Sequence, residues 1–242
     1  MTAMASAPAP DRDALLAAYA LPDRETTRVR MNFVASLDGA ATLDGRSGGL
    51  GDANDRLAMQ VLRTLADVVL VGAGTVRVEG YGGVAVSEAD AAWRVARGLP
   101  EQPRLAVVSS ALALDPSSAF FTAAVTRPIV VTHAGAPAAR RAALEAVADV
   151  VVAGERAVDV RAMLDSLAER GLRQVLCEGG PHLFGSLLEA DLVDELCLSL
   201  SPMLVAGDAG RIVRGVSELE RGMHLVHAMP AGDLLMLRYQ RG

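Results

Sequence analysis

Two glycine-rich turns contain the residue types that bind phosphate. The segment Gly72-Ala73-Gly74-Thr75 follows the apolar run 67–71, and Glu178-Gly179-Gly180 follows the run 174–177. A helical pattern comes next in each case, so each turn places glycine at the start of a helix. Unpaired backbone N–H groups and the helix dipole attract an anion there, and glycine permits its close approach. Both turns are therefore candidate phosphate-binding sites.

The neighbouring side chains are compatible with this interpretation without establishing it. Thr75 can donate its hydroxyl to a phosphate or cap the following helix, and Pro181 suits the first position of a helix, where its missing N–H costs nothing. A tight turn with nothing bound explains each segment equally well. The glycines lack the spacing of the Rossmann fingerprint, and neither turn has the Gly-Lys-Ser/Thr of a P-loop. Nucleotide hydrolysis is therefore not expected.

The elements that position these turns alternate between strand and helix along most of the chain. Continuous Val and Leu runs indicate buried parallel strands, whereas Leu57, Val61 and Leu65 recur at helical spacing. Near the C-terminus, strand patterns follow one another with no obvious helix between them. The expected fold class is α/β: a mostly parallel sheet flanked by helices, with antiparallel C-terminal edge strands.

The same patterns give approximate limits for the elements. Residues 87–98, which include Trp93, are expected to be a connecting segment, and Tyr81 is expected at the surface of a glycine loop or stacked on a planar ligand ring. Strands are expected at residues 29–36, 67–71, 104–109, 129–132, 150–152, 174–177, 195–200, 223–228 and 234–239. Helices are expected at residues 11–20, 54–65, 137–147, 160–170 and 181–190.

Composition and charge exclude several classes of protein. Hydrophobic residues make up 51% of the 242 residues but aromatic residues only 3%, so the core must consist of Ala, Val and Leu. The formal net charge of −6 argues against nucleic acid or an acidic membrane as a main partner. The sequence contains no uncharged apolar stretch of 18 residues, so no membrane span is expected. An anionic ligand must then be held by local dipoles and a few placed cations.

The N-terminus and the cysteines indicate a cytoplasmic location. Residues 1–27 are expected to be a leader, disordered at first, with a short helix, and residues 28–242 the folded domain. The leader lacks the basic and apolar regions of a signal peptide. Cys177 and Cys197 each lie in an apolar run, which is typical of buried, reduced thiols. The histidines show no metal-ligand spacing, so no metal is expected.

Four motifs occur in an order known from one family. They are Asn32–Gly39 (Asn-Phe-Val-Ala-Ser-Leu-Asp-Gly), Ser47-Gly48-Gly49, Val71–Val76 and Cys177–Pro181. In these segments the chain resembles the pyrimidine reductases of riboflavin biosynthesis, which share the dihydrofolate-reductase fold. The resemblance extends from about residue 28 to 240. Because no deaminase-like zinc motif is present, it implies a stand-alone reductase domain over 28–242.

The resemblance implies that NADPH lies across the carboxyl ends of the strands. Glu79 matches a family position that contacts the cofactor. Ser109 and Ser110 are candidates for binding the adenosine 2′-phosphate, since no carboxylate is close by to favour NAD, although ordinary solvated loop serines explain the pair equally well. The full set of expected cofactor-binding residues is Ala35, Gly49, Gly51, Gly72, Gly74, Thr75, Glu79, Ser109, Ser110, Gly179, Gly180, Pro181, Leu183 and Phe184.

On the substrate side, Ser47, Arg63 and Glu178 match family positions that touch the pyrimidine or its ribosyl phosphate. The alternative interpretation of Arg63 is a solvent-exposed arginine on a helix, with no contact to substrate. Asp38 and Glu178 are the candidate catalytic residues. A turn aspartate that binds its own backbone explains Asp38 equally well, whereas Glu178 is placed beside two glycines to accept hydrogen bonds from a ligand.

The implied reaction is hydride transfer from NADPH to C1′ of 5-amino-6-(5-phosphoribosylamino)uracil. One departure leaves the substrate open: the family usually has Asp-Asp-Pro and then an arginine after the Thr75 turn, but here Glu79–Val86 contains neither proline nor arginine, and the next arginine is Arg94. A dihydrofolate or pterin reductase is the first alternative. A non-catalytic NADPH-binding sensor is the second. A homodimer is also expected.

Overall fold

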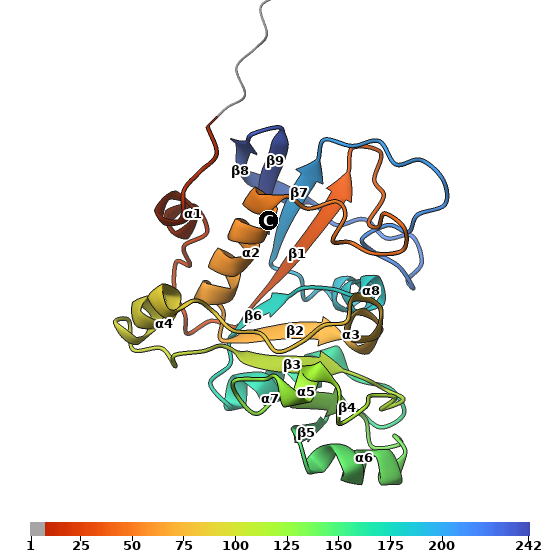
Figure 1. The fold of residues 1–242 in the computed structure, drawn as a ribbon. Coiled ribbons are helices and arrows are strands. Elements are labelled where there is room, and N and C mark those ends of the chain that lie inside the picture. The colour runs from red at the N-terminus through yellow and green to blue at the C-terminus, as the bar shows by residue number, and fades with distance from the viewer. Residues whose placement is uncertain (1–7) are drawn as a thin grey trace, which may run out of the picture.

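Nine strands form one sheet within residues 8–242, the part of the chain that the computed structural model describes (Figure 1). The sheet order is β5-β4-β3-β2-β6-β1-β7-β9-β8. The strands are β1 Arg28–Ser36, β2 Val68–Gly72, β3 Arg104–Val108, β4 Ile129–Thr132, β5 Asp149–Val152, β6 Gln174–Cys177, β7 Glu195–Ser201, β8 Met223–Ala231 and β9 Leu234–Arg241.

The strands from β5 to β7 run parallel, and β9 and β8 complete the sheet through antiparallel pairing. Val68 to Val71 of β2 are buried on both faces, which explains their continuous apolar pattern. Gly72 pairs with Val108, and Leu70 pairs with Cys177. The carboxyl ends of β3, β2 and β6 therefore meet at one edge of the sheet. The expected fold class is confirmed.

Helices cover both faces of the sheet. Buried side chains of α2, α5 and α6 belong to the hydrophobic cluster on one face, and those of α7 and α8 belong to the cluster on the other. The helices are α1 Arg12–Ala18, α2 Ala53–Leu65, α3 Ala73–Glu79, α4 Glu88–Val95, α5 Ala119–Thr122, α6 Ala138–Glu145, α7 Val160–Glu169 and α8 Pro181–Glu189.

The expectation of a connecting segment at 87–98 is wrong, because most of it is helix α4. Ser87 caps this helix by accepting from the backbone N–H of Asp90, a local signal that the sequence contains. Arg94 anchors the helix in the interior: its guanidinium donates to the carbonyls of Pro100, Thr64 and Ala66 at 2.6–2.8 Å. The short helix α5 was also not expected.

Helix α1 packs against α2 through Leu15 and Leu16 in the same hydrophobic cluster. The boundary at residue 28 stays a prediction, and the expected disorder of residues 1–10 lies largely outside the described residues. Among residues 8–242, none of the helices is both long and apolar enough to cross a bilayer.

Candidate active site

The two glycine turns lie side by side because β2 and β6 are neighbours. The backbone N–H of Gly72 donates to the carbonyl of Gly179 at 2.8 Å. A Cβ added to Gly180 would lie 3.1 Å from Thr75 Oγ1, so the threonine hydroxyl occupies the space that a side chain would need. Gly179 has φ of 118°, a conformation that favours glycine. The turns thus form one surface rather than two separate sites.

This surface forms the floor of an open groove of about 620 Å³, called here the outer groove. The groove is lined by residues of α3, of the start of α8 and of the Ser109-Ser110 exit of β3, and by Ala157, Val158 and Val160 around the start of α7. The expected cofactor residues that line it are Gly72, Gly74, Thr75, Glu79, Ser109, Ser110, Gly180, Pro181 and Leu183. Most of the residues expected to bind the cofactor are therefore brought together.

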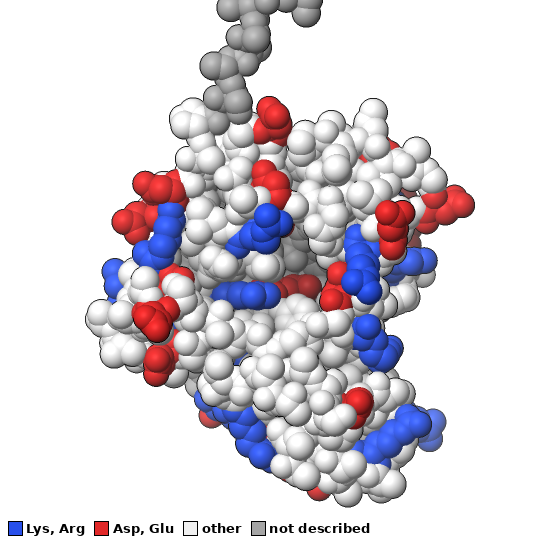
Figure 2. Space-filling view, in the orientation of Figure 1, with Lys and Arg blue, Asp and Glu red and all other residues white. Residues whose placement is uncertain are grey.

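A smaller and more enclosed space of about 340 Å³, the inner cavity, adjoins the outer groove. Thr42, Thr75, Glu79, Gly180 and Pro181 line both spaces. Figure 2 shows a hollow beside α2 with basic and acidic side chains on its rim. The expected substrate residues Ser47, Arg63 and Glu178 all line the inner cavity, as does Gly51.

Glu178 is held in the wall of the inner cavity by an arginine and a tyrosine. Its carboxylate accepts from Arg63 Nε at 2.7 Å and from Arg63 Nη2 at 2.6 Å. The Tyr81 hydroxyl donates to the same carboxylate and accepts from Arg63 Nη2 at 3.0 Å. Burial, reinforced by the charge of Glu178, raises the pKa of Tyr81 well above its usual value. The phenol therefore remains a donor through neutral pH.

Arg63 likewise keeps its proton and its positive charge. Burial disfavours the guanidinium, but the adjacent Glu178 carboxylate outweighs it and raises the pKa of Arg63 above its ordinary value. The side chain of Glu178 is only 4% exposed and that of Arg63 16%. A bidentate pair with this burial is rigid, so the inner cavity has a fixed polar wall.

Glu79 links the two spaces from the end of α3. Its carboxylate accepts from the backbone N–H of Ser47 at 2.9 Å and from the Ser47 hydroxyl at 3.1 Å. The loop that contains Ser47 is thereby fixed to the helix that follows the first glycine turn. Glu79 was expected to contact cofactor, which stays a prediction; the structure shows that it also positions the loop that contains Ser47.

Asp38 does not line either space. Its carboxylate accepts from the Ser36 hydroxyl and from the backbone N–H groups of Val205 and Ala206, the latter at 2.7 Å. These hydrogen bonds, that of Ser36 foremost, lower the pKa of Asp38 to about 2. The aspartate fastens the end of β1 to the segment after β7, and its catalytic role stays a prediction.

Three expected cofactor residues also lie outside the lining of the groove and the cavity. Ala35 is buried in β1, and Phe184 packs its ring against Phe33 with centroids 5.1 Å apart. Gly49 lies against Leu43. Gly179 lines the inner cavity rather than the groove. Their contacts with cofactor stay predictions.

Sequence reasoning missed several residues of the inner cavity. Arg56 and Met59 precede Arg63 by seven and four residues, and all three line it from one face of α2. That spacing is a signal which the sequence contains. Asn32 and Asp55 also line the cavity, and burial raises the pKa of Asp55. Tyr81, expected at a surface or on a ligand ring, instead binds Glu178.

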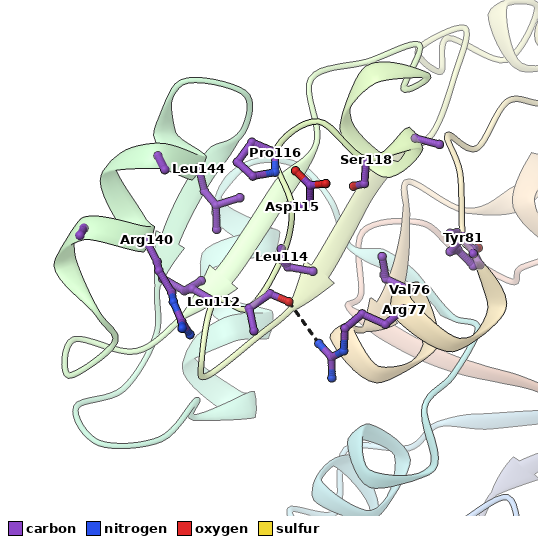
Figure 3. A pocket seen from close by; sticks show the side chains of 15 residues that line it. Val76, Arg77, Tyr81, Leu112, Leu114, Asp115, Pro116, Ser118, Arg140 and Leu144 are labelled. Carbon is purple, nitrogen blue, oxygen red and sulfur yellow. Dashed lines mark hydrogen bonds between the residues drawn. The ribbon is translucent and has the colours of Figure 1, made fainter.

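A third groove, of about 820 Å³, lies beside α3, where Val76 and Arg77 line it (Figure 3). It is mostly apolar, with Leu112, Leu114 and Leu144 among its lining residues. Arg77 donates to the carbonyl of Ala113 at 3.4 Å, and Arg140 donates to that of Ala111 at 2.9 Å. Both arginines thus reach the loop that follows Ser109 and Ser110. Arg77 also lines the outer groove.

The site contains an open groove, a smaller adjoining cavity and two glycine turns that begin helices. Across residues 8–242, no cluster of three or more His, Cys, Asp and Glu residues is placed to bind a metal. Fold and site together define an α/β nucleotide-binding protein of the reductase type. Residues 27–235 match the family described as the RibD C-terminal domain. The chain belongs to that family, as its motifs indicate.

Similar proteins support the assignment. The chain is 30% identical over 216 residues to a 2,5-diamino-6-ribosylamino-4(3H)-pyrimidinone 5′-phosphate reductase of Methanothermobacter thermautotrophicus, covering 87% of this chain and 96% of that protein. A reductase of the same name from Archaeoglobus fulgidus is 29% identical, with 80% and 89% covered. Reductases of this family use a nicotinamide cofactor.

Solved structures show the same fold. A pyrimidine reductase-like protein from Corynebacterium diphtheriae superposes with a TM-score of 0.84 at 28% identity, over 94% of this chain and 98% of that one. Acinetobacter baumannii RibD superposes with a TM-score of 0.72 at 18% identity, over 90% of this chain and 59% of that one.

Proposed function

We propose that the protein is an NADPH-dependent reductase that acts on a ribosylamino-pyrimidine 5′-phosphate of riboflavin biosynthesis. The observation that carries this proposal is the shared lining of the two spaces at Thr75, Gly180 and Pro181. A cofactor ring at that boundary faces a substrate in the inner cavity, which is the juxtaposition that hydride transfer needs.

The outer groove fits a dinucleotide. Gly74, at the start of α3, has open space where a side chain would stand, and a Cβ at Gly180 would press against Thr75 Oγ1. The pyrophosphate is expected at the start of α8 and beside Gly74 and Thr75. Ser109, Ser110 and Arg77 are expected at the adenosine end. The arginine supplies a cation, and this favours NADPH over NADH.

When bound, the nicotinamide supplies the hydride, which adds to C1′ of the opened ribosylimine while a proton from water adds to the nitrogen. Glu178 is expected to orient the substrate. A carboxylate has about four acceptor positions, and Arg63 and Tyr81 use three of those on Glu178. The remaining position on Oε1 can accept one hydrogen bond from a pyrimidine N–H.

The pyrimidine ring has two candidate forms. The motifs favour 5-amino-6-(5-phosphoribosylamino)uracil, whereas the two archaeal relatives are named for the 2,5-diaminopyrimidinone. These substrates differ at ring position 2 and present the same ribosyl phosphate and the same C1′. Both belong to the class of substrate proposed here.

The test is NADPH oxidation measured in parallel with each pyrimidine, with dihydrofolate, and with no second substrate. Turnover with a pyrimidine and not with dihydrofolate is the expected result. Turnover with dihydrofolate alone would make the protein a pterin reductase. Tight NADPH binding without turnover of any substrate would make it a sensor, and failure to bind NADPH would overturn all of these functions.

We also propose a cytoplasmic homodimer. Strand β8 is an edge of the sheet, and Leu225 and Val226 on it are 54% and 45% exposed. An exposed apolar edge favours pairing with a second copy. Cys177 and Cys197 are buried, as expected for reduced thiols. Sedimentation is expected to give a dimer at micromolar concentration, and a monomer there would contradict this proposal.

A further inference from the structure

A phosphorylated substrate needs a cation in the inner cavity. Arg77, the one basic residue between Thr75 and Arg94, lines the outer groove and not the inner cavity. Residues 79–93 contain neither lysine nor arginine. Arg94, the first arginine that follows, has a fully buried side chain which donates to the carbonyls of Pro100, Thr64 and Ala66. It anchors α4 and is not available to a ligand.

The described residues that line the inner cavity include two arginines, Arg56 and Arg63. Arg63 is committed to Glu178 and Tyr81. The guanidinium of Arg56, in contrast, makes no ion pair or hydrogen bond with any other part of residues 8–242, and the side chain is exposed at the mouth of the cavity. It therefore retains its full set of donors for a ligand.

The other charged groups of the cavity increase the need for this cation. Glu178 is neutralised by Arg63, and Glu79 accepts from Ser47. Asp55 adjoins Arg56 in sequence and also lines the cavity, where burial raises its pKa. Without Arg56 the cavity would present carboxylates with no unengaged positive charge, and it would repel a phosphate.

We propose that Arg56 binds the 5′-phosphate of the substrate at the mouth of the inner cavity. Seven residues separate it from Arg63 on the same face of α2, which is about 10 Å along the helix axis. The two arginines can thus contact opposite ends of one ligand, Arg56 at the phosphate and the Arg63–Glu178 pair at the ring. The identity of the ligand rests on the proposed function, whereas the phosphate seat rests on the cavity itself.

The test compares binding of ribose 5-phosphate to the wild type, Arg56→Gln and Arg56→Lys by calorimetry. Loss of charge-assisted hydrogen bonds is expected to weaken binding about 10- to 100-fold in Arg56→Gln, with partial recovery in Arg56→Lys, which keeps the charge. With the pyrimidine substrate, KM is expected to rise by a similar factor while kcat and NADPH affinity change little. Arg170→Gln is the control, since Arg170, the C-cap residue of α7, is exposed and donates to the carbonyl of Ser166 in that helix.

Equal affinity of Arg56→Gln and the wild type for ribose 5-phosphate would overturn the inference, as would failure of the wild type to bind it. If the wild type reduces neither pyrimidine, but ribose 5-phosphate binding still depends on Arg56, the proposed substrate is wrong and the phosphate seat stands. If the pyrimidine is reduced and Arg56→Gln leaves KM unchanged, only the phosphate seat is wrong.

Discussion

At the scale of single residues, the site depends on a glutamate whose orientation is set by its neighbours. Arg63 and Tyr81 together take most of the acceptor capacity of Glu178. If a substrate binds in the inner cavity as proposed, it meets a carboxylate with one acceptor position left and a fixed direction. This arrangement selects for a ligand that donates a single hydrogen bond at that point.

Replacement of Tyr81 by phenylalanine tests this arrangement. The variant retains the ring and the Arg63–Glu178 pair but leaves one acceptor position of Glu178 and one donor of Arg63 without their partner. We expect unfolding free energy to fall by about 1 kcal/mol and KM for the pyrimidine to rise, with NADPH affinity unchanged. Urea denaturation and steady-state kinetics measure these. An unchanged KM would show that the tyrosine has no part in orienting Glu178 toward substrate.

Replacement of Arg77 by alanine tests cofactor choice. Arg77 lines the outer groove and donates to the loop that follows Ser110. Loss of its charge is expected to weaken 2′,5′-ADP binding roughly tenfold and to leave 5′-AMP binding unchanged, because only the former has a 2′-phosphate. Calorimetry with the two nucleotides measures the difference. Equal weakening of both would place Arg77 away from the 2′-phosphate.

At the scale of elements, the loop between α3 and α4 positions Tyr81 by packing against the end of α5. A Cβ at Gly83 would collide with the backbone carbonyl of Ala123, whereas a Cβ at Gly82 would lie 3.9 Å from the Ala119 side chain, an ordinary contact. The backbone around Gly83 thus has no room to shift toward α5. The position of Tyr81 follows from this contact.

Adjacent glycine variants separate this packing from general effects of substitution. Gly83→Ala is expected to lower unfolding free energy by about 1–3 kcal/mol, the usual cost of overpacking, and to raise KM for substrate by displacing Tyr81. Gly82→Ala is the matched control and should change both quantities little. Thermal unfolding and steady-state kinetics of the two variants measure these changes. Similar stability and KM in Gly83→Ala and Gly82→Ala would contradict the packing argument.

At the scale of the whole molecule, one buried glutamate joins the parallel strands to the C-terminal hairpin. Glu195 of β7 is fully buried and contacts Arg30 of β1 at 2.6 Å and Arg238 of β9 at 2.9 Å. Burial alone would raise its pKa, but these guanidiniums outweigh it and lower the pKa below the ordinary value. These two ion pairs therefore connect the parallel part of the sheet to the C-terminal hairpin.

The lowered pKa makes the stability of the fold dependent on pH. A carboxyl with a lower pKa in the folded state stabilises fully above its unfolded pKa, about 4.3, and loses that contribution as pH falls through the folded pKa. Glu195→Gln is expected to lose about 3–5 kcal/mol at pH 7 and to show a weaker loss of stability below pH 5 than the wild type. Urea denaturation from pH 3 to 7 measures both. Parallel pH profiles would contradict this role.

The sequence by itself determined the strands, most helices and the two glycine turns, because apolar runs and glycines after strands are local signals. It also determined the family, since the order of the motifs along the chain is a sequence property. Arg63, Ser47 and Glu178 were found in this way and lie together in the inner cavity.

The tertiary structure alone decided which side chains meet. The β3-β2-β6 order joins the glycine turns into one surface. The same packing turns Tyr81 inward onto Glu178, buries the side chain of Arg94 of α4 and leaves Arg56 at the mouth of the cavity. Contacts of this kind depend on residues far apart in the chain, so no local pattern specifies them. The glycine turns were therefore predictable as parts, and their union into one site followed from the neighbouring positions of β2 and β6.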